Sequence, residues 1–228
     1  MTRPVLLLEF DDLLVGTRAV RFAALQEALL TEGVALDEGT FDARCAGLTL
    51  EEAVRAAARG SSLEFDETGL ELTARRAAAL QAKTASRGIA LMPGIADFVR
   101  HAAGRAVVGL VAAAPRSEVS QILELAGLTD HFSHVGCEDD GGPRATLAER
   151  WQGVRRRLLA RVAAQDVPAV IIALCGTGAG IDAAKGPGVR VFATGAIAAP
   201  IAFRSDGWIP SLEQLTVPEL LALEALSE

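Results

Sequence analysis

Four short runs of almost uninterrupted apolar residues constrain the fold of this chain more than any other feature. They are PVLLLEF (4–10), AVVGLVAA (106–113), AVIIAL (169–174) and VRVFAT (189–194), and FSHVGC (132–137) is a shorter candidate. Strands that are apolar along their whole length are typical of parallel sheets covered on both faces. Helical patterns separate the runs, as in 146–165, where Thr146 and Glu149 have the spacing of a capping box. This alternation predicts an α/β fold with a doubly wound, Rossmann-like parallel sheet.

One long segment interrupts the alternation. Residues 18–87 contain only helical patterns, and MPG at 92–94 marks the return to the α/β pattern. We therefore predict a core domain formed by residues 1–15 and 89–228, with a helical cap domain, residues 16–88, inserted after the first strand. Ligands of open α/β sheets bind at the carboxyl ends of the strands. A cap inserted at that point would cover the site.

Charge and composition exclude several classes of function. The net charge of −7 over 228 residues argues against a nucleic-acid partner, which would require a basic surface. No apolar run approaches the length of a membrane span, and the N-terminal residues are charged too early for a signal peptide. Three scattered cysteines, Cys45, Cys137 and Cys175, are typical of buried thiols in a reducing compartment. We expect a cytoplasmic protein that does not contact membranes.

Six segments, taken in order, carry a resemblance to a known family. They are LEFDDLLVGT (8–17), GLTLEEAV (47–54), LMPGIADFV (91–99), LVAAAPRSEV (110–119), GIDAAKGPGVRVFAT (180–194) and SDGWIPSLEQL (205–215). Their order and spacing resemble the haloacid dehalogenase superfamily, and in particular its branch of β-phosphoglucomutases and phosphoglycolate phosphatases. The resemblance covers nearly the whole chain. It implies a hydrolase-family fold of phosphatases and phosphomutases, with Mg²⁺-dependent phosphoryl transfer at the carboxyl ends of the strands.

The catalytic residues that the resemblance implies are mostly replaced. Glu9 stands at the position of the attacking Asp, and Asp11 keeps the acid/base position. Ala112 replaces the hydroxyl residue that binds phosphate. The list of replacements continues with Gly142 at the position of the phosphate-binding Lys, Cys175 and Gly176 at the positions of the Mg²⁺-binding acids, Asp12 at the position of a Gly, Gly16 at that of a later acid, and Leu50 at that of a substrate-binding Arg of mutases.

These replacements predict a degenerate site. The extra methylene of Glu9 moves its carboxylate by about 1.5 Å, and misplacement on that scale costs about 10²-fold in rate. Gly176 offers no carboxylate to Mg²⁺, a cation that proteins hold through carboxylates. We predict a pseudoenzyme that acts by binding, with Glu9 and Asp11 as vestigial catalytic residues, no metal site and no cofactor. The alternative is a phosphatase or phosphomutase that uses Mg²⁺ and an altered site to process a small phosphorylated metabolite.

A weak anion site is the remaining candidate. CGTGAG (175–180) is a glycine-rich turn between a strand and a helix, where backbone N–H groups can bind an anion. It lacks the third glycine and the later acid of a dinucleotide fingerprint, so glycines that only form a tight turn are the competing interpretation. The predicted anion-binding residues are Ala112, Arg144, Gly176, Thr177 and Gly178. The partner could therefore be a small anionic ligand or a protein. The sequence identifies neither the partner nor the oligomeric state.

Overall fold

Six strands form a single parallel sheet within residues 3–59, 65–85, 90–140, 142, 145–162 and 170–225, the part of the chain that the computed structural model describes. The strand order is β3-β2-β1-β4-β5-β6, and each neighbouring pair is parallel. The strands are β1 Val5–Glu9, β2 Val107–Val111, β3 His134–Gly136, β4 Ile171–Cys175, β5 Val189–Thr194 and β6 Gly207–Ile209. The predicted doubly wound, Rossmann-like α/β fold is confirmed.

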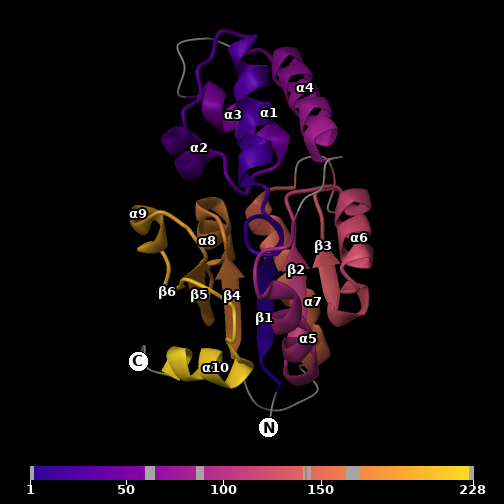
Figure 1. The fold of residues 1–228 in the computed structure, drawn as a ribbon, viewed down its shortest axis with the longest axis vertical. Helices are drawn as coiled ribbons and strands as arrows, with labels where there is room; N and C mark the ends of the chain where they lie inside the picture. The colour runs from indigo at the N-terminus through magenta and orange to yellow at the C-terminus, as the bar shows by residue number, and fades with distance from the viewer. Residues whose placement is uncertain are drawn as a thin grey trace.

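Helices cover both faces of the sheet (Figure 1). The core helices are α5 Ile95–Arg105, α6 Arg116–Leu125, α7 Leu147–Val162, α8 Gly178–Ala184, α9 Ala199–Ala202 and α10 Val217–Ala225, with a 3-10 turn at Thr129–His131. Leu6 and Leu8 of β1 pack in one apolar cluster with α5, α6 and α10. Val5 and Leu7 pack in a second cluster with α7 and α8. Burial on both faces explains why the strand sequences lack a polar alternation.

The segment between β1 and α5 is helical. It contains α1 Arg18–Leu30, α2 Glu38–Arg44, α3 Leu50–Ala58 and α4 Glu67–Ala85, which we call the cap helices. They lie beyond the carboxyl ends of the strands (Figure 1). Their apolar cluster is separate from those of the core and includes Leu25, Leu29, Phe41 and Val54. The domain boundaries, 1–15 with 89–228 and 16–88, stay a prediction, because residues 86–89 lie outside the described part.

Local sequence signals set the starts of two helices near the cap–core junction. Thr49 and Glu52 form a capping box at α3, with both reciprocal hydrogen bonds present. Thr146 and Glu149 make the same pair of contacts before α7, as their spacing predicts. Over the ranges that the structure describes, no helix combines the length and hydropathy that crossing a bilayer requires.

Candidate functional site

The carboxylate of Glu9 is buried and held by the loop that follows β4. Its Oε2 accepts hydrogen bonds from the backbone N–H groups of Gly176, at 2.9 Å, and Thr177, at 3.0 Å. Its Oε1 accepts the Thr177 hydroxyl at 2.5 Å. Glu9 is the last residue of β1, and β4 lies beside β1 in the sheet. The Glu9 side chain, which is one methylene longer than that of Asp, therefore reaches the loop at the end of β4. The N–H groups predicted to bind an anion therefore already hold the chain's own carboxylate.

Two glycines make room for this side chain. A Cβ at Gly180, in α8, would lie 2.3 Å from Glu9 Oε2 and 2.4 Å from its Cδ. A Cβ at Gly47, where φ is +82°, would lie 2.9 Å from Glu9 Oε1 and 2.1 Å from the Thr177 hydroxyl. The Glu9 carboxylate thus occupies space that any side chain at either position would fill. Glu9, Gly47 and Gly180 fit together as one packing unit.

Asp11 is engaged in a buried ion pair. Its Oδ1 lies 2.6 Å from Nη1 of Arg21, a cap residue on α1, and only 4% and 1% of the Arg21 and Asp11 side chains are exposed. Oδ1 also accepts the Thr17 hydroxyl at 3.2 Å, and Oδ2 accepts the Ala113 N–H at 3.2 Å. The Arg21 guanidinium further donates to the carbonyl of Leu48. Arg21 therefore ties Asp11 to the cap.

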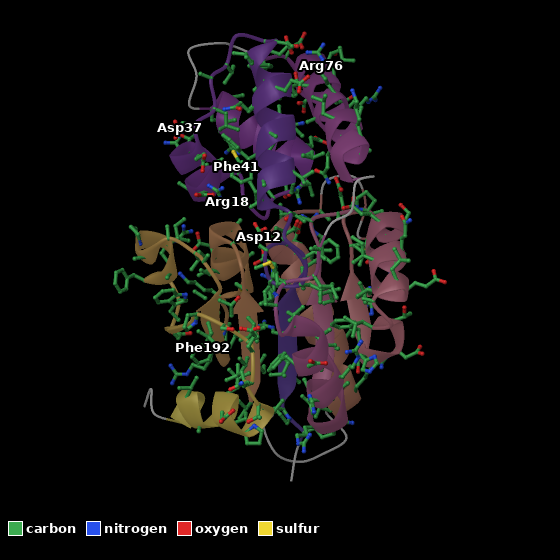
Figure 2. The ribbon with its side chains drawn as sticks, in the orientation of Figure 1. Asp12, Arg18, Asp37, Phe41, Arg76 and Phe192 are labelled. Atoms are coloured by element: carbon green, nitrogen blue, oxygen red, sulfur yellow. The ribbon has the colours of Figure 1, made fainter. Side chains whose placement is uncertain are left out.

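Asp12 shapes the turn between β1 and the cap. Its φ of 54° lies in the left-handed region, which suits the Gly that the family motif has there. Its Oδ1 accepts the backbone N–H groups of Thr17, at 2.9 Å, and Arg18, at 2.8 Å, at the start of α1. Figure 2 shows Asp12 where the sheet meets the cap helices, below Arg18. Asp12 thus acts as a capping residue for the entry into the cap.

The same turn fills the space beside Gly176. A Cβ there would lie 2.4 Å from the carbonyl carbon of Asp12 and 2.7 Å from the backbone nitrogen of Leu13. These are backbone atoms, so a side chain at 176 requires the turn to move. The turn borders a cavity of about 310 Å³ that is lined in part by Asp12, Gly176, Thr177 and Gly178, and neither Glu9 nor Asp11 lines it. The carboxylates of Glu9 and Asp11 face the packed interior.

The other predicted site residues are dispersed. Ala112 is fully buried at the end of β2, and its N–H donates to Gly136 of the neighbouring strand. Gly178 begins α8, and a Cβ there would meet Ile201 at 2.9 Å. Gly142, at the position of the family's Lys, has a φ of +91° that a lysine would adopt only with strain. Arg144 lies outside the described residues.

A second ion pair connects the cap to the core, with the arginine in the core and the acid in the cap. Arg150 of α7 lies with Nη2 3.1 Å from Oε2 of Glu52 in α3, and its side chain is 2% exposed. Its Nη1 donates to the Ala145 carbonyl at 2.8 Å. Sequence reasoning missed Arg21 and Arg150, because each looks like one more arginine of an amphipathic helix. The only sequence signal is that both fall at positions that the helical period places near the apolar stripe.

Burial is the largest influence on the pKa values of Glu9 and Asp12. It raises the pKa of Glu9 well above the usual range, with Asp11 adding to the shift and the Thr177 hydroxyl opposing it. Burial and the neighbouring Asp11 raise the pKa of Asp12 to about 6, against hydrogen bonds from Arg18 and Thr17. Both groups therefore hold a proton more tightly than a solvated carboxylate does.

The residues do not fit the Mg²⁺ that the resemblance implies. Gly176 has no side chain, and burial raises the pKa of the Cys175 thiol, which keeps it neutral. Glu9 is committed to three donors, and the Arg21 cation neutralises Asp11. Within the described ranges, no three His, Cys, Asp or Glu side chains converge as a metal site would require. The expected lack of a cofactor stays a prediction.

Comparison with known proteins places the fold. No family model and no curated protein matches the sequence. β-Phosphoglucomutase from Clostridium difficile superposes with a TM-score of 0.75 at 16% identity over 100% of both chains. A predicted phosphoglycolate phosphatase from Haemophilus somnus 129PT gives 0.70 at 15%, covering 98% of this chain and 99% of that one. CbbY from Rhodobacter sphaeroides, in complex with phosphate, gives 0.67 at 20%, covering 94% and 96%. The predicted resemblance is confirmed at the level of the fold.

Proposed function

We propose that this chain is a haloacid dehalogenase-like protein whose phosphoryl-transfer site is largely lost and which acts by binding. The observation that carries this proposal is the state of Glu9. Both of its carboxylate oxygens are taken up by Gly176 and Thr177, at 2.5 to 3.0 Å, inside a packed interior. An attacking carboxylate needs one oxygen free and in line with phosphorus. A raised pKa also favours the protonated form of Glu9, which cannot attack phosphorus.

The rest of the site supports the same proposal. Phosphoryl transfer depends on positive charge and donors that are placed in advance around the transferred group. Here the N–H groups of the 176–177 turn serve Glu9, and Asp11 is neutralised by Arg21. An acid/base residue in a buried ion pair cannot pass a proton to a leaving group without breaking that pair. Glu9 and Asp11 therefore serve the closed arrangement of cap and core.

The alternative function is that of a Mg²⁺-dependent phosphatase or phosphomutase that processes a small phosphorylated metabolite with an altered site. Two observations favour it. Carboxylates remain at positions 9 and 11, and the described fold is shared with proteins named as a phosphoglucomutase and a phosphatase. This alternative requires the cap to open, Glu9 to leave its three donors, and Asp11 to separate from Arg21.

The test is turnover of phosphate monoesters. Purified protein is given millimolar Mg²⁺ and a panel of aryl phosphates, sugar phosphates and phosphoglycolate, and phosphate release is measured. The matched variants are Glu9→Gln and Asp11→Asn, with Glu124→Gln, an exposed acid on α6, as the control. We expect no release above that of the variants. Release by the natural protein and by the control that is lost in both site variants would establish the alternative function.

A further inference from the structure

The cavity beside the Asp12 turn lies where the cap meets the core, and its volume is about 310 Å³. The cap contributes the start of α1 and the end of α2 to its lining. The core contributes the loop after β4 and the loop after β5 as far as Ile201 in α9. This volume lies at the lower end of the range for organic ligands, so it accommodates a compact molecule.

Each of the three apolar clusters of the protein reaches this cavity. Met92 packs against the cluster on the α5 face of the sheet. Ile197 and Ile201 pack against the cluster on the α7 face, and Ala46 belongs to the cluster of the cap. An apolar molecule bound here would therefore bury apolar surface against all three clusters, which is favourable in proportion to the area removed from water.

The loop after β5 is apolar although much of it is exposed. Residues 195–203 read GAIAAPIAF and contain no polar side chain. Ala196 and Ala198 are exposed and line the cavity, and Phe203, directly after α9, is 85% exposed. Contiguous apolar surface that stays exposed marks an interaction site. The composition of this loop therefore indicates an apolar ligand.

One polar group of the lining lacks a partner. Oδ1 of Asp12 accepts the N–H groups of Thr17 and Arg18, whereas Oδ2 has no hydrogen bond or ion pair with any described residue. Oδ2 is also open to solvent, so a ligand can reach it. The other two charged residues of the lining are paired with each other, because Arg18 lies 2.7 Å from Asp42. The lining thus offers one acceptor within an apolar surface.

We propose that this cavity binds a compact, uncharged apolar molecule, such as a phenol, that donates one hydrogen bond to Oδ2 of Asp12. The apolar lining contacts the ring, and the carboxylate, which only accepts, receives the hydroxyl hydrogen bond. Burial and the neighbouring Asp11 raise the pKa of Asp12 to about 6, and a donated hydrogen bond would offset part of that effect. The inference rests on the proposed function, because it names a ligand class for a protein that acts by binding.

Charged ligands fit less well. A phosphate would meet Asp12 and Asp42 with like charge, and the N–H groups of the 176–177 turn already bind Glu9. A cation would lie beside the guanidinium of Arg18, which Asp42 and Glu38 hold in place. A metal ion needs several ligands around one point, and the acids of the described residues do not converge in this way.

The experiment is calorimetric titration of the full chain with 4-methylphenol. The control ligand is 4-fluorotoluene, in which a fluorine of similar size replaces the hydroxyl group and no donor remains. We expect saturable binding of 4-methylphenol with a Kd below about 1 mM. We expect 4-fluorotoluene to bind at least about tenfold more weakly, because it makes no hydrogen bond to the carboxylate.

Two variants locate the site. Asp12→Asn must keep its oxygen on the two N–H groups at the start of α1, so its NH₂ group takes the place of Oδ2. The charged acceptor is then gone, and binding of 4-methylphenol should weaken by at least about fivefold. Gly16→Leu adds a side chain to the lining, where a Cβ would meet only Met92, at 3.5 Å, and it should also weaken binding. Gly104→Leu, at an exposed position of α5 with open space around it, should leave the Kd unchanged.

Each outcome decides the inference. Absence of 4-methylphenol binding, equal binding of 4-fluorotoluene, or an unchanged Kd in either site variant would overturn it. If Asp12→Asn does not fold, Gly16→Leu and the comparison of the two ligands in the natural protein decide instead. Turnover of phosphate monoesters would contradict the proposed function, whereas absence of both turnover and 4-methylphenol binding would contradict this inference alone.

Discussion

Gly180→Ala is the substitution that tests the packing of Glu9 most sharply. In an ordinary helix this change stabilises, because alanine is preferred to glycine by about 1 kcal/mol. At position 180 the added methyl would lie 2.3 Å from Glu9 Oε2 and 2.4 Å from Oε1. The carboxylate would have to move, and Glu9 is only 1% exposed. We therefore expect a helix-favouring substitution to destabilise the protein.

The magnitude follows from what Glu9 would lose. It accepts three hydrogen bonds, from Gly176, Thr177 and the Thr177 hydroxyl, all of 3.0 Å or less. Partial loss of such bonds, together with overpacking of a buried site, costs about 2 to 4 kcal/mol. The gain in helix propensity offsets about 1 kcal/mol of this. The net expectation is a loss of about 1 to 3 kcal/mol in the free energy of unfolding.

The assay is urea unfolding, with Gly104→Ala as the matched control. Gly104 lies in α5 and has open space around its Cβ position, so alanine there should stabilise by up to about 1 kcal/mol. In a Glu9→Ala background the clash is gone, and Gly180→Ala should become neutral or stabilising. Equal effects of Gly180→Ala and Gly104→Ala in the natural background would refute the packing argument.

Two further predictions concern the acids that follow Glu9. Arg21→Met leaves Asp11 buried without its cation and should lower the free energy of unfolding by about 3 to 5 kcal/mol. The control Arg75→Met removes an exposed ion pair and should lower it by less than about 1 kcal/mol. Equal losses for the two variants in urea unfolding would contradict this prediction. Asp12 has a pKa of about 6 in the folded protein against an ordinary 3.8, so the folded state binds a proton at Asp12 more tightly than the unfolded state does. The free energy of unfolding should therefore fall as the pH rises from about 4 to about 6, by at most about 3 kcal/mol. Asp12→Asn should lack this loss, and parallel stability curves for the two proteins across that pH window would count against it.

The sheet was predictable because its evidence is local. Val5 to Glu9 and the other long apolar runs are buried on both faces, and their short length between helical patterns favours parallel strands. The exception is β6, a strand of three residues that contains the exposed Trp208 and carries no apolar run. Short edge strands depend on pairing with a neighbour, which here is β5.

The candidate site was predictable in part. By the resemblance, the residues at positions 9, 112 and 176 predict that groups needed for phosphoryl transfer are absent, and this stays a prediction. The contacts that Glu9 and Asp11 make instead join segments that are distant in the sequence. The spacing of residues along the chain does not predict such contacts. Nothing near Gly180 signals that it accommodates Glu9, and nothing in α1 signals that Arg21 reaches Asp11. Packing of this kind is specified by the assembled core.

Repair of the site illustrates the same limit. On the resemblance, Gly176→Asp would supply a metal ligand only in combination with Glu9→Asp, Ala112→Ser, Gly142→Lys and Cys175→Glu, because these groups act as a unit. The structure places the backbone of Asp12 and Leu13 within 2.4 to 2.7 Å of a Cβ at 176. Gly176→Asp should therefore be destabilising unless the turn itself is redesigned, and its thermal unfolding in the presence of Mg²⁺ measures this.

The most direct measurement is a crystal structure grown with high concentrations of Mg²⁺ and phosphate. Our account predicts that Glu9 Oε2 still accepts the N–H groups of Gly176 and Thr177, and that Asp11 still pairs with Arg21. It further predicts that no ion lies between the two carboxylates. A Mg²⁺ ion bound there, with Glu9 turned away from the 176–177 turn and phosphate beside it, would contradict the claim that this site no longer supports phosphoryl transfer.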